Sequence, residues 1–203
     1  MKDEKPVLSS IEKKDEIDYK QYVKERFEID DEEAEKIELF EAESLSEHYK
    51  RQYEALNDKK LENVKILVVP DDVWQKSQPS ESAADKQLVS FKESYFKNIE
   101  KPDEIAWMLH ELAHCKRFLD SESSEAYKKD NQTFAFNNIK SEYTYPNNKV
   151  EEYAFSQQFE YLKNQGKTRQ EIAEMLKEYY KEDDFLFFNK ILDKTYKEGE
   201  LVY

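Results

Sequence analysis

The sequence predicts an α+β fold that is mostly helical, with a small β-sheet packed on a buried helix. Only two glycines occur among 203 residues, which disfavours an all-β fold with many tight turns. Several long segments carry apolar residues at helical spacing among Glu and Lys. One β-branched run at residues 64–69 is typical of a strand. The order of helices, a short β layer and further helices indicates the α+β class.

Composition indicates a folded protein with a charged exterior. Charged residues make up 38% and aromatic residues 14% of the chain, so a core of large rings is feasible. The formal net charge of -14 argues against nucleic acid or an anionic membrane as the main partner. Cys115 is the only cysteine, so no internal disulfide can form. Without a signal-peptide pattern or a long apolar run, the sequence predicts a cytoplasmic protein.

The first third of the chain predicts an acidic helical extension, residues 1–60, separable from a second domain at 61–203. Residues 1–15 are polar and predict a loose arm, and residues 16–57 predict helices. Asp30 followed by Glu33 is typical of a capping box. His48 falls on the charged part of this segment and is expected at the surface.

The later elements follow from turn and capping signals. A second strand is expected at residues 88–96, a helix at 102–119 that begins with Pro102, and a polar, irregular stretch at 120–148. A helix at 149–164 closes at Gly166. Thr168 and Glu171 form a capping-box pattern for a helix through about residue 180, and a last helix begins at residue 185 and ends near 199.

The motif HExxH occurs at His110-Glu111-Leu112-Ala113-His114. Two histidines four residues apart lie on one helix face, so both imidazoles can bind one zinc ion. Glu111 is rotated by about 100° from His110 and can reach the metal's water without binding the metal. The expected chemistry is metal-assisted hydrolysis, with Glu111 moving the proton from the water to the leaving amine.

The alternative is that the two histidines are core residues with other hydrogen-bond partners. The helix around the motif is apolar on nearly all sides, with Ile105, Met108 and Leu112 on one stripe, which predicts burial. Burying two imidazoles without partners costs several kcal/mol. A shared cation satisfies both rings at once.

A hydrolytic zinc site needs a third protein ligand, and the helix at 149–164 offers Glu151 or Glu152. Glu151 falls within the apolar stripe that contains Phe155 and Leu162, whereas Glu152 falls at its edge. Glu151 is therefore the predicted ligand. Cys115 points away from the histidine face and is expected to be a small buried side chain.

The HELAH motif together with Glu151-Glu152-Tyr153-Ala154 resembles the gluzincin metallopeptidases, in their small, minimal form. The resemblance covers roughly residues 64–165 and implies a zincin-like metallopeptidase domain with an active-site helix and a glutamate helix. It also implies a short sheet whose edge strand, here the one at 88–96, binds an extended peptide or protein substrate as a further strand. For the oxyanion that forms in such a reaction, Tyr143 and Tyr145 are the candidate stabilisers.

Two functions remain open from the sequence. The first is a zinc metallopeptidase that hydrolyses peptide bonds. The second is a catalytically inactive or latent zincin-like protein that acts as a binding module. An open fourth coordination position beside Glu111 favours the enzyme, and a position filled from the N-terminal region favours the alternative. The sequence leaves the oligomeric state open.

Overall fold

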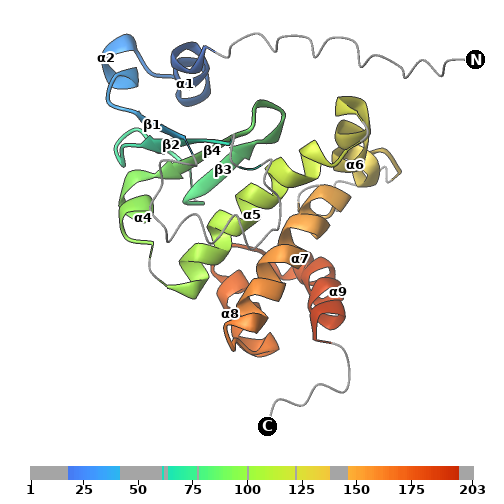
Figure 1. Ribbon diagram of the computed structural model, residues 1–203. Coiled ribbons are helices and arrows are strands. Elements are labelled where there is room, and N and C mark those ends of the chain that lie inside the picture. The colour runs from blue at the N-terminus through green and yellow to red at the C-terminus, as the bar shows by residue number, and fades with distance from the viewer. Residues whose placement is uncertain are drawn as a thin grey trace, which may run out of the picture.

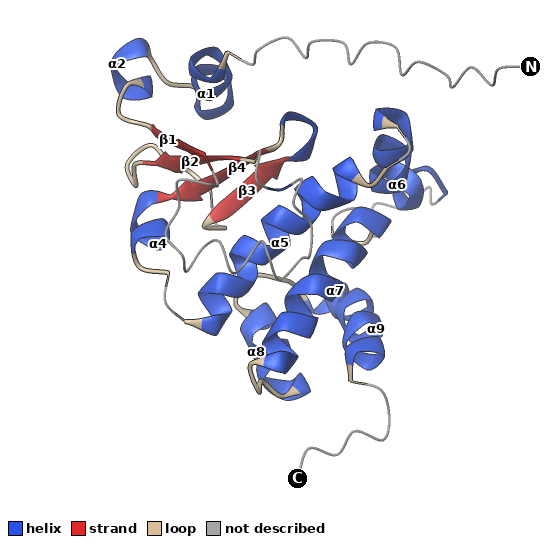
Figure 2. Cartoon of the chain, in the orientation of Figure 1, coloured by secondary structure: helices blue, strands red, loops and turns tan. Residues whose placement is uncertain are grey.

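The computed structural model describes residues 18–41, 61, 64–76, 78–99, 101–121, 123–137 and 146–196. It is an α+β fold, mostly helical, with a four-stranded mixed sheet, as the sequence predicted. The helices α1 (Tyr19–Phe27) and α2 (Asp31–Ala34) cover one face of the sheet, and the long helix α5 (Pro102–Leu119) covers the other (Figure 1). Behind α5 lie α7 (Lys149–Asn164), α8 (Arg169–Lys177) and α9 (Phe185–Thr195), so α5 is enclosed between the sheet and a helical layer (Figure 2).

The elements of the described chain have the following bounds: α1 Tyr19–Phe27, α2 Asp31–Ala34, β1 Glu38–Glu41, β2 Lys65–Val69, β3 Ser80–Ala83, η3 Ala84–Lys86, β4 Leu88–Lys92, α4 Glu93–Lys97, α5 Pro102–Leu119, α6 Ser124–Asn137, α7 Lys149–Asn164, α8 Arg169–Lys177, η5 Glu182–Asp184 and α9 Phe185–Thr195.

The strand order is β1-β2-β4-β3, so β1 and β3 form the two edges of the sheet within the part of the chain that the structure describes. β2 is parallel to β4 and antiparallel to β1, and β3 is antiparallel to β4. Successive side chains of β2 alternate between two apolar clusters: Ile66 and Val68 pack toward α5, and Leu67 and Val69 pack toward α1. Coverage on both faces explains why this strand is a continuous apolar run.

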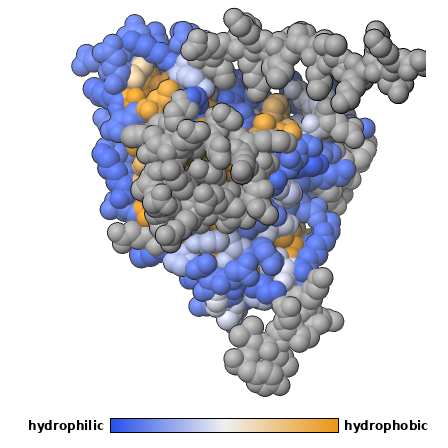
Figure 3. Space-filling view, viewed as in Figure 1, coloured by the Kyte–Doolittle hydropathy of each residue, from blue (hydrophilic) through white to orange (hydrophobic). Residues whose placement is uncertain are grey.

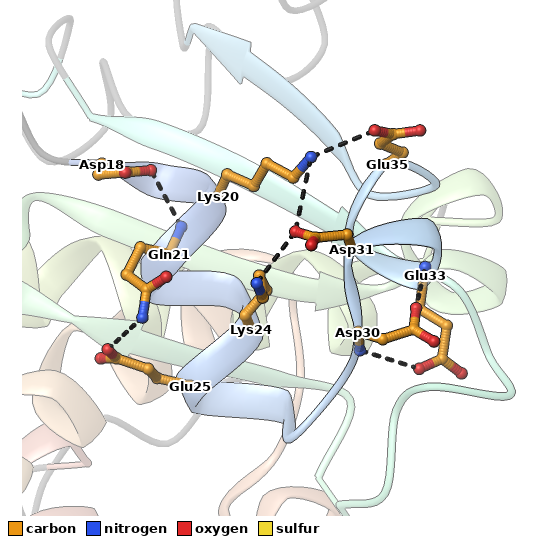
Figure 4. Close-up of polar contacts among 9 residues, drawn as sticks. All are labelled: Asp18, Lys20, Gln21, Lys24, Glu25, Asp30, Asp31, Glu33 and Glu35. Atoms are coloured by element: carbon orange, nitrogen blue, oxygen red, sulfur yellow. Dashed lines mark hydrogen bonds and ion pairs between the residues drawn. The ribbon is translucent and has the colours of Figure 1, made fainter.

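The N-terminal segment differs from the helical expectation for residues 16–57. Residues 38–41 form the edge strand β1, because their backbone pairs with β2. Val23 and Phe27 of α1 share an apolar cluster with β2. On the outer side, a polar network joins the two helices, in which Lys20 pairs with Asp31 and Glu35 (Figure 4). The segment 18–41 is therefore packed on the sheet, and the division of the chain at residue 60 stays a prediction.

Two further expectations are corrected. Residues 88–96 do not form an edge strand, because β4 ends at Lys92 and lies between β2 and β3, and α4 follows it. The edge strand beside α5 is β3. The stretch 120–148 is not irregular throughout, because α6 occupies Ser124–Asn137.

The predicted capping signals are confirmed at both long helices near the motif. α5 begins at Pro102, where Glu104 Oε2 accepts a hydrogen bond from Lys101 N at 3.1 Å. α7 runs from Lys149 to Asn164, and Gly166 follows it with φ +86°. The predicted capping boxes at α2 and α8 are also present. These local signals fix where each helix begins and ends.

Much of the described surface is hydrophilic on the face seen in Figure 3, as a chain rich in charged residues requires. Within the described residues, none of the helices combines the length and apolar character that crossing a membrane would take.

We expect Phe27→Ala to lower the free energy of unfolding by about 3–5 kcal/mol, since Phe27 is a buried ring that joins α1 to the sheet. Urea denaturation measures this change. Leu186→Ala is the matched control, because Leu186 is 85% exposed and its loss should change stability by less than about 0.5 kcal/mol. A neutral effect of Phe27→Ala would mean that α1 is separable from the rest, as the division at residue 60 implies.

Candidate metal centre

The HExxH motif lies on α5, the helix between the sheet and the helical layer. Its residues from Ile105 to Cys115 are all buried, because one stripe packs on the sheet and another packs on α7, α8 and α9. His110, Glu111 and His114 lie on the remaining side of the helix, along a cavity. The burial expected from the sequence is confirmed.

α7 brings an acidic side chain to the two histidines. Asn148 caps this helix by accepting hydrogen bonds from Val150 N and Glu151 N, both at 2.9 Å. Glu151 therefore lies in the first turn, and its Oε2 atom is 3.3 Å from His110 Nε2 and 3.6 Å from His114 Nε2. The two Nε2 atoms are 3.1 Å apart. Three potential ligand atoms thus form a small triangle.

The size of this triangle fits a metal ion. A tetrahedral ion with ligand distances of about 2.0–2.2 Å separates its ligand atoms by about 3.3–3.6 Å, close to the three distances above. Among the described residues, no group donates a hydrogen bond of good geometry to the buried Glu151 Oε2 atom, and such an atom is costly without a partner. His110, His114 and Glu151 are a buried group that could hold a metal ion.

Gln158 orients His110. It lies seven residues after Glu151 on the same face of α7, and its Oε1 atom is 3.0 Å from His110 Nδ1. An amide oxygen only accepts hydrogen bonds, so Nδ1 is the donor, and in the neutral ring the lone pair of Nε2 then faces the triangle. This arrangement matches metal-binding histidines, whose second ring nitrogen usually donates to an oxygen.

Electrostatics couple Glu151 to the histidines. Burial alone would raise the pKa of Glu151, but the charge of His114 and the contact with His110 outweigh it and lower that pKa to about 2. Burial likewise opposes protonation of His114, yet the charge of Glu151 raises its pKa above the usual value. The carboxylate is therefore ionised at neutral pH, which is the form that binds a cation.

Glu111 lies at the wall of the same cavity and does not belong to the triangle. Ser80 Oγ, at the start of β3, donates a hydrogen bond to Glu111 Oε1 at 3.0 Å. The cavity has a volume of about 380 Å³ and is bordered by Glu111 and by the three potential ligands. A group bound in the cavity can thus reach both the triangle and the carboxylate of Glu111.

The other sequence candidates have different positions. Glu152, which the sequence analysis placed at the edge of the inward face, pairs with Lys194 of α9 and is not one of the three potential ligands. Cys115 is buried, and burial raises the pKa of its thiol. Tyr143, Tyr145 and His48 lie outside the described residues, so their roles stay predictions.

Sequence reasoning missed the contacts of Ser80 and Gln158. The sequence contained a signal for the contact of Gln158, because an amide on an apolar helix face needs a buried partner. It contained no signal for the contact of Ser80, since this residue reaches Glu111 through the pairing of β3 with β4.

The fold and the site together define an α+β protein with a buried His-His-Glu group on two adjacent helices. The chain matches no protein-family profile, no curated protein and no solved structure.

Proposed function

We propose that the protein is a zinc-dependent metallopeptidase of the minimal gluzincin type, which hydrolyses peptide bonds. The observation that carries this proposal is the triangle formed by His110, His114 and Glu151, with Glu111 at the wall of the same cavity. Two imidazoles and one carboxylate are a ligand set of catalytic zinc sites, which keep the fourth position for water or substrate.

Each side chain has a defined role in the proposed reaction. His110, His114 and Glu151 hold the ion, and Gln158 fixes the ring of His110. A bound zinc ion supplies a Lewis acid that polarises the scissile carbonyl and lowers the pKa of water. Glu111 takes the proton from the attacking water and passes it to the leaving nitrogen. Ser80 donates a hydrogen bond to Oε1 of Glu111 and so helps to hold this carboxylate at the cavity wall.

Two features of the surroundings support an extended polypeptide as substrate. β3 pairs with β4 on one side, and within the described chain no strand pairs with its other edge, where a peptide backbone can add. A second cavity of about 990 Å³ adjoins the metal-site cavity, since Lys76 and Trp107 line both. Together the two cavities offer room for several residues of an extended peptide.

The rival proposal is a latent or purely binding protein, and a fourth position filled from the N-terminal region would support it. The described N-terminal residue that lines the cavity is Arg26. Its guanidinium is held by Glu81, and a charged guanidinium does not ligate a cation. Among the described N-terminal residues, Arg26 therefore does not fill the fourth position.

The test is to load the purified chain with zinc, measure the metal content, and incubate it with a mixed peptide library read by mass spectrometry. We expect about one zinc per chain, cleavage that stops with a chelator, and recovery when zinc is restored. One bound zinc without any cleavage would favour the latent alternative. A protein that binds no zinc would contradict both.

A further inference from the structure

Two basic side chains share one carboxylate at the wall of the metal-site cavity. Arg26 of α1 donates from Nε to Glu81 Oε1 at 3.1 Å and from Nη2 to Glu81 Oε2 at 2.6 Å. Lys76 Nζ donates to the same Oε2 atom. All three residues line the cavity that also contains His110 and Glu151. The cluster is therefore adjacent to the proposed reaction centre.

Both basic groups are held in place by the packing of α1 on the sheet. The ring of Phe27 contacts Trp74, with ring centroids 5.7 Å apart. Lys76 Nζ lies 5.5 Å from the centre of the Phe27 ring and 5.8 Å from that of Trp74. Arg26 precedes Phe27 and is carried to the cavity by the same helix. Side chains fixed in this way lose little entropy when they bind a ligand.

The charges of this cluster do not cancel. Arg26 and Lys76 carry two positive charges against the single negative charge of Glu81, which leaves one positive charge at the cavity wall. A divalent ion in the triangle would be balanced by the carboxylates of Glu151 and Glu111. With that ion bound, the cavity would be locally positive in a chain whose formal net charge is -14, and a positive wall attracts an anionic group.

We infer that Arg26 and Lys76 form a subsite for a carboxylate of the substrate, supplied by an Asp or Glu side chain or by a free C-terminus. Guanidinium and ammonium groups bind carboxylates through charge-assisted hydrogen bonds. A cavity of about 380 Å³ has room for such a group beside the metal. This inference rests on the proposed function, because it concerns the substrate of the same site.

The test measures binding to the full, zinc-loaded chain and does not depend on turnover. The probes are short peptides capped with a hydroxamate, a group that binds zinc. One probe is neutral, with Gln and a C-terminal amide. A second set replaces Gln by Glu at each position in turn, and a third probe has Gln and a free C-terminal carboxylate. Isothermal titration gives the affinity of each probe and separates the two sources of the carboxylate.

We expect one of the carboxylate probes to bind about tenfold more tightly than the neutral probe. Arg26→Met and Lys76→Met should each remove most of that advantage, while the affinity for the neutral probe stays within about twofold. Lys20→Met is the matched control, because Lys20 lies on α1, pairs with Asp31 and Glu35, and does not line the cavity. It should keep the full advantage.

An unchanged neutral-probe affinity also shows that each variant is folded and zinc-loaded. Equal binding of all probes would overturn the inference and leave the proposed function standing. The same conclusion would follow if the tighter binding of the carboxylate probe survives both Arg26→Met and Lys76→Met. If the wild-type chain binds zinc but no hydroxamate probe, or binds no zinc, the proposed function fails and the subsite with it.

Discussion

Replacing Glu111 with Gln is expected to abolish nearly all peptide hydrolysis and to leave zinc binding intact. The amide cannot take a proton from water, and loss of a general base of this kind costs about 10²- to 10⁴-fold in rate. The three potential ligand atoms belong to His110, His114 and Glu151, so the metal should stay. The measurement is the cleavage rate of a peptide identified by the library digest, together with the zinc content of the variant.

The matched control for this change is Asp120→Asn at the C-terminal cap of the same helix. Asp120 pairs with Lys116 and does not line the metal-site cavity, so the variant should retain the wild-type rate. Cleavage by Glu111→Gln at the wild-type rate would mean that another group accepts the proton. Loss of zinc from Glu111→Gln would mean that this carboxylate takes part in metal binding.

The second large effect concerns the two adjacent glutamates of α7. Glu151→Ala removes one of three protein ligands and should weaken zinc binding by more than about a hundredfold, because changes that only reorient a ligand already cost about 10- to 100-fold. Glu152→Ala removes an ion pair with Lys194, whose side chain is 59% exposed. Since such exposed pairs contribute little, zinc affinity should change by less than about twofold.

Competition with a chromogenic zinc chelator measures both affinities. The melting temperature supplies an independent readout, because a ligand that binds the folded state raises it. Zinc should raise the melting temperature of the wild-type chain and of Glu152→Ala, and raise that of Glu151→Ala much less. The reverse order would show that Glu152 is the ligand in solution. If neither variant changes zinc affinity or the melting response, the third ligand lies outside α7.

The grouping of His110, His114 and Glu151 that the sequence predicted is present in the structure, because spacing within one helix decides which side chains face the same way. His110 and His114 meet because four residues make about one helical turn. Glu151 and Glu152 are adjacent on α7, so they differ by about 100° in direction around the helix axis. In the structure, Glu151 Oε2 lies 3.3 Å from His110 Nε2. The bounds of α5 and α7 follow from Pro102 and Gly166, which act on the backbone nearest to them.

The sheet could not be predicted to the same degree. The segment at residues 38–41 is rich in Glu and was expected to be helical, yet it pairs with β2. β4 was expected at an edge, yet it lies between β2 and β3. A strand is stabilised by a partner that is distant in the chain, so its own residues do not reveal whether it is central or at an edge.

The sequence by itself determined the helical elements around the motif and the three side chains that could hold a metal ion, because hydrogen bonds and periodicity within a helix are local. Only the tertiary structure decided what surrounds them. Ser80 reaches Glu111 from β3, and Arg26 reaches Glu81 from 55 residues away, through the packing of α1 on the sheet. Contacts of this kind depend on how separate elements pack, and no periodic pattern along the chain encodes them.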